Sequence, residues 1–321
     1  MKTVLLDGGL ANQMTQYIFA RCVQEAQPEE LVLLDDLWFF CRHDAFCEQS
    51  ALSEHHEYQL TKFPNIKPLP QMSTYFDEDV WAEIVRTAQT RPPLRGGSWL
   101  PQILKENGLD FFMIAETQLR QFDGMIAQMP YYYCMPEMLQ AQGNVYYFGW
   151  FTHGGWFMRH EDLFRQEFEF PPLWQAHDLQ MAQEIAESTA VSVHIRRGGY
   201  ARLGQATPED YFRQAISLIC KELKKNQKKR IKPPHFFVFS DEIDWCREHA
   251  AEYGLADLPY PVTYGCTERT NLDNHCDMQL MSGCDVMILE LNSVYSYMAA
   301  LCRETTYLRI TGKGGNGQET P

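Results

Sequence analysis

The chain has 321 residues, of which 45% are hydrophobic and 22% charged, as in a globular protein with two domains of about 150 residues each. Lys and Arg number 28 against 42 Asp and Glu, so the net charge is −14, which argues against a nucleic-acid binder because phosphate backbones repel an acidic surface. The composition also excludes collagen, coiled coil and disorder, and no run reaches the roughly 18 apolar residues of a membrane span.

The N-terminal half starts with an apolar strand expected over residues 3–6. Gly8 and Gly9 break that strand, and a helix with one apolar stripe is expected to follow them. Further strands are expected over residues 31–34 and 144–151. A strand, a glycine turn and a helix in succession predict an α/β unit.

The C-terminal half alternates strands and helices more clearly. Strands are expected over residues 191–195, 236–239 and 286–289, and amphipathic helices follow the first and the third of them. This alternation predicts a mostly parallel sheet. Each of the three strands runs into a small polar cluster at its carboxyl end, which is the edge where open α/β sheets bind their ligands. The sequence therefore predicts a binding site built from three loops.

The strongest chemical signal is the segment His194-Ile195-Arg196-Arg197, at the end of the first of these strands. Strand alternation puts His194 and Arg196 on one face and Arg197 on the other. A guanidinium is a planar fork of donors that stays charged at any working pH and matches phosphate oxygens. Together with the glycine pair that follows, the segment predicts a phosphate site, with a salt bridge between domains or at the surface as the alternative.

Two further loops are candidates for the same site. Asn292 and Ser293 precede a helix, whose amide N–H groups and positive dipole end favour an anion, although N-capping is the commoner use of these residues. Ser240, Asp241 and Glu242 could present a carboxylate to a nucleobase or ribose, or form a solvated loop.

Other patterns are weaker. Gly8 and Gly9 before a helix fit a phosphate cradle but lack the full GxGxxG and GxxxxGK[ST] patterns. Asp77 and Asp79 spell the DxD in which many sugar-nucleotide enzymes hold a metal, so a metal-dependent sugar-nucleotide transferase stays open beside a solvated acidic face. Residues 221–232 carry seven basic side chains, which indicate a solvated helix end or a surface that docks on anionic lipid.

Read together, these clusters resemble the motifs of the α-1,2-fucosyltransferases of glycosyltransferase family 11. The motifs occur in the family's order. Residues 8–20, GGLANQMTQYIFA, correspond to the family's GGLGNQMFQYAFA, and residues 194–200, HIRRGGY, correspond to its HxRRGDY. Residues 239–246, FSDEIDWC, correspond to FSDDIxWC, and residues 277–284 and 292–298, DMQLMSGC and NSVYSYM, correspond to DMxLMSxC and NSSFSWW. A weaker echo of the family's GYFQSEKYF lies at residues 149–157.

The resemblance implies a GT-B-like α/β fold in which two Rossmann-like halves face a cleft. The expected domains are an N-terminal acceptor-side domain over 1–180, a C-terminal GDP-fucose-binding domain over 181–310 and a flexible tail over 311–321. The implied reaction is inverting, metal-independent transfer of L-fucose from GDP-fucose, with no cofactor, to the 2-hydroxyl of a terminal β-galactoside. The acceptor would be a galactose-terminated oligosaccharide or glycolipid. Ten scattered cysteines without a CxxC pair favour the cytoplasm, where the chain could contact the inner membrane face.

The resemblance also implies roles for single residues. As fucose departs through an oxocarbenium-like transition state, negative charge grows on the β-phosphate, and a fixed cation stabilises that state more than the ground state. Arg196 is expected in this role, with His194 as a second catalytic candidate and Arg197 as a donor-binding residue or one bonded within the fold. The other expected donor-binding residues are Gly8, Gly9, Asn12, Ser240, Asp241, Glu242, Asn292, Ser293 and Ser296.

The chain departs from the family pattern at Ala11, at Tyr297-Met298 in place of Trp-Trp, and at two further places that bear on the site. The motif Asp is Gly199 here, which removes a carboxylate beside the arginine pair, and the third motif has one extra residue between Cys284 and Asn292. A catalytically impaired member that binds nucleotide or glycan is therefore an alternative function. Glu209 and Asp210 lie near the lost carboxylate, either as acceptor-binding acids or as acids at a helix start.

Two tryptophans are candidates for the acceptor site. Trp150 and Trp156 fall in the weaker motif, and their rings could stack on a sugar or belong to the core.

Overall fold

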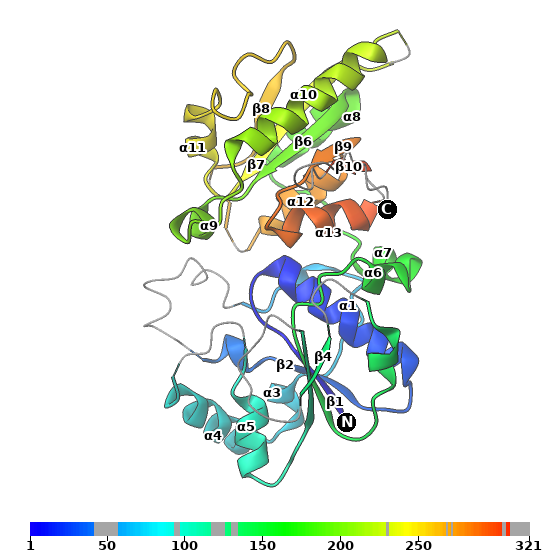
Figure 1. Cartoon of the computed structure of the whole chain (residues 1–321), viewed down its shortest axis with the longest axis vertical. Helices are drawn as coiled ribbons and strands as arrows, with labels where there is room; N and C mark the ends of the chain where they lie inside the picture. Colours follow the sequence, from blue (N-terminus) through cyan, green and yellow to red (C-terminus); the bar gives the residue numbers. More distant parts are fainter. Residues whose placement is uncertain are drawn as a thin grey trace. The chain divides into compact units, whose positions relative to one another are not determined.

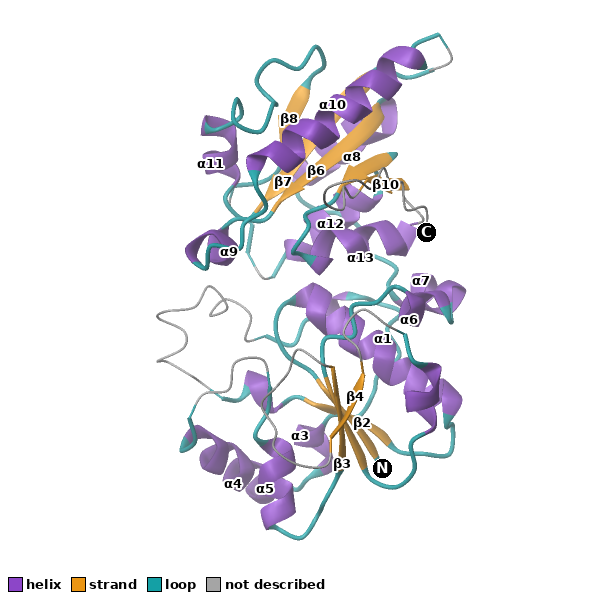
Figure 2. Cartoon of the chain, viewed as in Figure 1, coloured by secondary structure: helices purple, strands orange, loops and turns teal. Residues whose placement is uncertain are grey.

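The computed structural model describes residues 1–41, 57–92, 97–116, 126–129, 134–228, 231–267, 269–270, 272–303 and 306–308. The chain divides into two compact units, Met1–Glu169 and Phe170–Pro321. Each is an α/β unit with its own parallel sheet (Figures 1 and 2). The expected fold class, an α/β chain with two Rossmann-like halves, is confirmed.

The first unit contains a five-stranded parallel sheet in the order β2-β1-β5-β3-β4. Its strands are β1 (Lys2–Leu5), β2 (Val32–Asp35), β3 (Phe112–Glu116), β4 (Ile126–Met129) and β5 (Val145–Phe148). Its α-helices are α1 (Leu10–Ala26), α3 (Met72–Tyr75), α4 (Glu78–Gln89), α5 (Leu100–Glu106), α6 (Gly155–Met158) and α7 (Glu161–Glu167). Short 3₁₀ helices cover Leu37–Phe39, Leu60–Lys62 and Pro136–Gln140.

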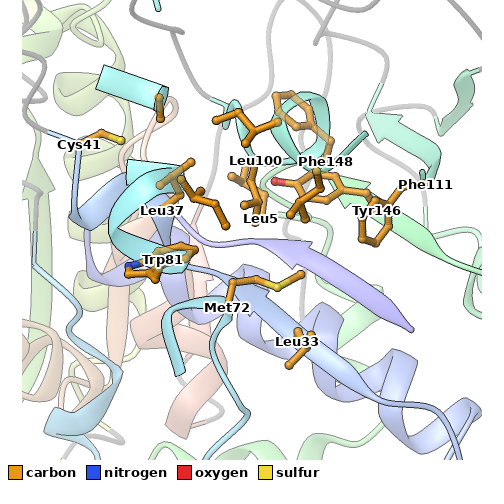
Figure 3. Packing of buried hydrophobic residues seen from close by; sticks show 14 of the residues in the cluster. Leu5, Leu33, Leu37, Cys41, Met72, Trp81, Leu100, Phe111, Tyr146 and Phe148 are labelled. Atoms are coloured by element: carbon orange, nitrogen blue, oxygen red, sulfur yellow. The ribbon is translucent and has the colours of Figure 1, made fainter. Parts of the chain in front are cut away.

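Helices cover both faces of this sheet, because its strands are apolar on both sides. Side chains of β1, β2 and β5 that include Leu5, Leu33 and Phe148 meet those of α3, α4 and α5 in one buried cluster (Figure 3). On the other face, Phe19 of α1 packs edge-on against Tyr147 with ring centroids 5.0 Å apart. The alternation of neighbouring β5 residues between the two faces explains this division.

The second unit contains a five-stranded parallel sheet in the order β10-β9-β6-β7-β8. Its strands are β6 (Thr189–Ile195), β7 (Pro234–Ser240), β8 (Val262–Tyr264), β9 (Val286–Ile288) and β10 (Thr306–Leu308). Its helices are α8 (Ala176–Glu187), α9 (Gly198–Arg202), α10 (Glu209–Lys225), α11 (Ile243–Glu248), α12 (Asn274–Ser282) and α13 (Val294–Arg303). None of the helices that the structure describes in either unit is long and apolar enough to cross a membrane.

The boundary between the units differs from the one expected at residue 180. That position lies inside α8, whose Met181 and Ile185 are buried, and α8 packs on β6 and α12 of the second unit. A break within α8 would expose that apolar face, so the whole helix belongs to the second unit. The expected tail, residues 311–321, lies outside the described residues.

The strand expected over residues 144–151 ends at Phe148. The backbone N–H groups of Trp150 and Phe151 donate to the Glu116 carboxylate at 2.8 and 3.2 Å instead of continuing a ladder. Phe151 has a φ of 51°, a left-handed conformation that no strand continues. Four short strands, β3, β4, β8 and β10, were not among the strands expected from the sequence.

Candidate functional site

The carboxyl ends of β6, β7 and β9 bring the three predicted loops together. β6 is the middle strand of the second sheet, with β9 and β7 as its neighbours. Ile195 pairs in register with Ser240 of β7, and Val193 pairs with Ile288 of β9. The residues that follow, Arg196 among them, therefore emerge at one edge of the sheet, as the sequence predicts.

Asp241 holds the turn that carries Arg196. Its Oδ2 lies 2.9 Å from Nη1 of Arg196, and its Oδ1 accepts the backbone N–H of Arg197 at 2.9 Å. A Cβ on Gly198 would lie 2.2 Å from Oδ2, so a glycine is needed for this approach. The register of β6 and β7 makes Asp241 the counter-ion of Arg196 in this structure, and its expected place near a guanine stays a prediction.

The Arg196–Asp241 pair is partly exposed, with 18% and 20% of the two side chains accessible. Both side chains thus keep some surface that an incoming anion can contact. An anion with more than one charge could therefore replace Asp241 as the partner of Arg196. The geometry agrees with a phosphate-binding guanidinium at this position.

Arg197 is bound within its own unit. Its Nε donates to Glu242 at 3.3 Å, its Nη1 donates to the Tyr253 hydroxyl at 3.3 Å, and its guanidinium lies 3.1 Å from the centre of the Trp245 ring. Of the two expectations for Arg197, the structure favours bonding within the fold, because three partners already hold the cation.

His194 lies beneath the Arg196 turn, on the sheet face opposite Val193 and Ile195. Its side chain is 4% exposed, and its ring centroid is 5.5 Å from that of Tyr295. Burial, helped by the nearby Arg196 charge, lowers the pKa of His194 to about 3. An imidazole with this pKa is neutral and weakly basic at pH 7. The surroundings therefore favour a packing role over the catalytic role expected from the sequence.

The loop between β9 and α13 is held mainly by contacts inside the unit. The Asn292 amide donates to the Gln205 carbonyl at 2.8 Å, and the Ser293 hydroxyl accepts the Tyr295 N–H at 3.3 Å, as a helix-capping serine does. Ser296 is fully buried, and its hydroxyl accepts the Glu290 N–H at 3.4 Å. The expected contact of Ser296 with a diphosphate is therefore not supported, because its side chain has no exposed surface.

Glu290 is a site residue that sequence reasoning missed. It follows β9, is 2% exposed, and its Oε2 accepts the backbone N–H of Arg196 at 3.3 Å. The Thr207 hydroxyl donates to its Oε1. Burial raises the pKa of Glu290, and these hydrogen bonds act in the opposite direction. The one available signal was the extra residue between Cys284 and Asn292, which falls in the segment containing Glu290.

The glycine turn of the first unit has the geometry that its sequence predicts. Gly8 has a φ of +70°, which strains any other residue, and a Cβ there would lie 2.6 Å from Nδ2 of Asn12, whose side chain would have to move. Gly9 is the N-cap residue of α1, and Asn12, in the first turn, is partly exposed. These residues form an open helix start at the carboxyl end of β1.

The candidate acceptor residues have ordinary structural roles in this structure. Trp156 is 1% exposed and packs edge-on against Phe19 at 4.9 Å, so it belongs to the core. Trp150 is partly buried against the cluster of Figure 3. Glu209 and Asp210 lie in the first turn of α10, where negative charges interact favourably with the helix dipole.

The two aspartates of the DxD pattern mark the start of a helix. Asp77 is the N-cap residue of α4 and Asp79 lies in its first turn, and both are exposed. Among the residues that the structure describes, no three His, Cys, Asp or Glu side chains are grouped so that they could hold a metal ion. Favourable interaction with the α4 dipole accounts for both acids.

Buried carboxyl groups line the carboxyl edge of the first sheet. Asp7 follows β1, Asp35 ends β2 and Glu116 ends β3, and each is at most 2% exposed. Burial raises the pKa of Asp7 and Asp35 to about 6 and that of Glu116 to about 7. This edge therefore carries groups that change charge close to neutral pH.

Glu116→Gln is expected to change how stability depends on pH. An unfolded chain releases the glutamate proton near pH 4.3, whereas the folded chain keeps it to about pH 7. In that window the folded state binds more protons, so the wild type loses up to about 1.4 kcal/mol per unit of rising pH. The variant should lack this loss, which urea unfolding at pH 5 and pH 7 measures. Parallel pH dependence of the two proteins would contradict the raised pKa.

Comparison with known proteins adds sequence relatives to this geometry. A model described as glycosyl transferase family 11 matches residues 128–313. The Escherichia coli alpha-1,2-colitosyltransferase is 28% identical over 166 residues, 50% of this chain, so the match spans about half (51%) of that relative. The Escherichia coli O-antigen biosynthesis glycosyltransferase WbnK is 26% identical over 309 residues, 92% of this chain and 88% of WbnK. The crystal structure of NodZ alpha-1,6-fucosyltransferase soaked with GDP-fucose matches 94% of this chain and 92% of its own, with 14% identity and a TM-score of 0.45.

Proposed function

The chain belongs to glycosyltransferase family 11, and from this premise we propose that it transfers L-fucose from GDP-fucose to the 2-hydroxyl of a terminal β-galactoside. The transfer inverts the configuration at the anomeric carbon of fucose and needs no metal ion. The α-1,2 linkage in the name of the colitosyltransferase supports attack by a 2-hydroxyl. The proposed acceptor is a galactose-terminated oligosaccharide or glycolipid.

The observation that carries the proposal is the position of Arg196. It follows the middle strand of the second sheet, and its guanidinium is paired with a partly exposed carboxylate that a phosphate could replace. Placed against the β-phosphate, this cation stabilises the charge that develops as the C1–O bond to fucose breaks. We therefore assign the donor to the second unit and the acceptor to the first.

The proposed activity predicts GDP release when the protein is mixed with GDP-fucose and a β-galactoside. EDTA should leave the rate unchanged, and Asp77→Ala with Asp79→Ala should retain full activity, because these acids belong to the α4 start. GDP-mannose and UDP-galactose serve as control donors. Inhibition by EDTA that manganese reverses would instead support the metal-dependent transferase. Tight calorimetric binding of GDP-fucose without any product would support the impaired member that Gly199 suggests.

The basic end of α10 suits a peripheral contact with an anionic membrane, and we propose that it lies against the inner membrane face. Lys221, Lys224, Lys225 and Lys228 are exposed there, and Ile231 beyond them is 99% exposed. Lysines near an anionic surface contribute about 1 kcal/mol each. Sedimentation with phosphatidylglycerol vesicles should decrease in Lys221→Glu/Lys225→Glu, whereas phosphatidylcholine vesicles should bind neither protein. Equal sedimentation of both proteins would reject this contact.

A further inference from the structure

The turn that carries Arg196 is held by an acid on each side, from the two neighbours of β6. Asp241, after β7, pairs with the guanidinium itself at 2.9 Å. Glu290, after β9, accepts the backbone N–H of Arg196 at 3.3 Å. The motif Asp that the family places beside the arginines is Gly199 in this chain. In this chain the Glu290 carboxylate, which follows the neighbouring strand β9, contacts the same turn.

The Glu290 carboxylate binds the main chain of Arg196 through its Oε2. Its Oε1 accepts the Thr207 hydroxyl, so both oxygens have donors although the side chain is only 2% exposed. A carboxylate bound to a backbone N–H determines where the turn begins and hence the direction of the Arg196 side chain. Glu290 thus acts on the backbone of Arg196, whereas Asp241 binds the guanidinium and competes with a phosphate for it.

The peptide group that joins Leu289 to Glu290 is anchored at both its N–H and its carbonyl. The Glu290 N–H donates to the buried Ser296 hydroxyl of α13 at 3.4 Å. The Tyr211 hydroxyl of α10 donates to the Leu289 carbonyl at 2.6 Å. Two helices therefore hold the segment that carries the Glu290 carboxylate. Because that carboxylate is fixed, it also fixes the position of the Arg196 backbone.

We propose that Glu290 is the positioning residue for Arg196, aiming its guanidinium at the terminal phosphate of a bound nucleoside diphosphate. This inference rests on the proposed function, because it needs a nucleoside diphosphate at Arg196. GDP is a suitable probe, since its terminal phosphate carries the charge that appears on the leaving group. GMP lacks that phosphate and reports on the rest of the nucleotide site.

Calorimetry with GDP and GMP tests the proposal on Arg196→Ala, Glu290→Ala and the double variant. Arg196→Ala should weaken GDP binding by about tenfold or more, because the charge-assisted contact with the terminal phosphate is lost. It should weaken GMP binding by less than about twofold. Glu290→Ala should show the same selectivity, with GDP binding about fivefold weaker. The double variant should match Arg196→Ala alone, because Glu290 acts through Arg196.

Two conservative variants separate positioning from stability. Glu290→Gln can accept the Arg196 N–H with its amide oxygen and donate to Thr207, so it should bind GDP within about twofold of the wild type. Glu290→Asp draws the carboxylate back by one methylene, so it should weaken the binding of GDP but not that of GMP. This variant provides the test if Glu290→Ala does not fold. Equal loss of GDP and GMP, or full additivity with Arg196→Ala, would overturn the inference alone. Failure of the wild type to bind GDP would overturn the proposed function, and this inference with it.

Discussion

Arg196→Ala is expected to lower the rate constant of fucosyl transfer by roughly 10²–10³-fold, the usual cost of removing one group that stabilises developing negative charge. The cation meets the β-phosphate most strongly when the bond to fucose is breaking. The loss should therefore fall mainly on kcat and less on the KM for GDP-fucose. Arg196→Lys keeps a point charge but loses the planar fork, so its kcat should lie between those of the alanine variant and the wild type. Initial rates of GDP release over a range of donor concentrations measure all three.

The matched control for Arg196→Ala is an arginine paired with an acid at the surface. Arg86 is 74% exposed on α4 and pairs with Glu83, so Arg86→Ala should keep the wild-type kcat. A folded Arg196→Ala protein with near-wild-type kcat would rule out Arg196 as the leaving-group cation. Loss of activity in both arginine variants would point to a general effect of charge and not to this site.

Arg269→Met is expected to lower the free energy of unfolding by about 3–5 kcal/mol at pH 7.5. The Arg269 guanidinium is 8% exposed and lies 2.7 Å from Asp178, 2.6 Å from Asp277 and 3.5 Å from Asp273. These carboxylates come from α8, from α12 and from the residue before α12. Removing the cation leaves three buried acids without their shared partner. Their mutual repulsion should weaken the packing of α8 on α12.

The destabilisation by Arg269→Met should depend on pH in a definite direction. Burial already raises the pKa of Asp277 to about 6 in the wild type, and loss of the guanidinium raises it further. An acid with a raised folded-state pKa stabilises the fold relatively more at low pH and less as pH rises through that pKa. The difference in free energy of unfolding between wild type and variant should therefore be smaller at pH 5.0 than at pH 7.5.

Urea unfolding at the two pH values measures this effect, with Arg247→Ala as the control. Arg247 pairs with Asp244 at 2.7 Å in the same unit, but the two side chains are 50% and 67% exposed. An exposed pair of this kind should cost less than about 1 kcal/mol at either pH. Equal losses in the two variants would show that the Arg269 cluster does not act as a buried ion network.

The central strand and its chemistry were predictable from sequence. Alternation over residues 191–195 marked β6, and Arg196 was expected at its carboxyl end. Glu209 and Asp210 were expected as possible acids at a helix start, and α10 begins at Glu209. Such signals are local, so neighbouring residues suffice to reveal them.

The first sheet was harder to predict. β3 and β4 were not predicted, and their place in the sheet comes from pairing, β3 with β5 and β4 with β3. The same holds for the pairing of Trp150 and Phe151 with Glu116, which joins residues more than 30 positions apart. Hydrogen bonds over such distances leave no pattern in a window of ten residues.

What the sequence alone determined is the family and its candidate chemical group, an arginine pair after an apolar strand in an order of motifs typical of that family. The tertiary structure decided how those groups are used. The register of β6 with β7 and β9 gave Arg196 an exposed acid on one side and a buried acid, Glu290, on the other, and it buried His194. Strand register depends on packing across the whole sheet, so the partners of Arg196, which lie 45 and 94 residues away, are set only when the chain folds.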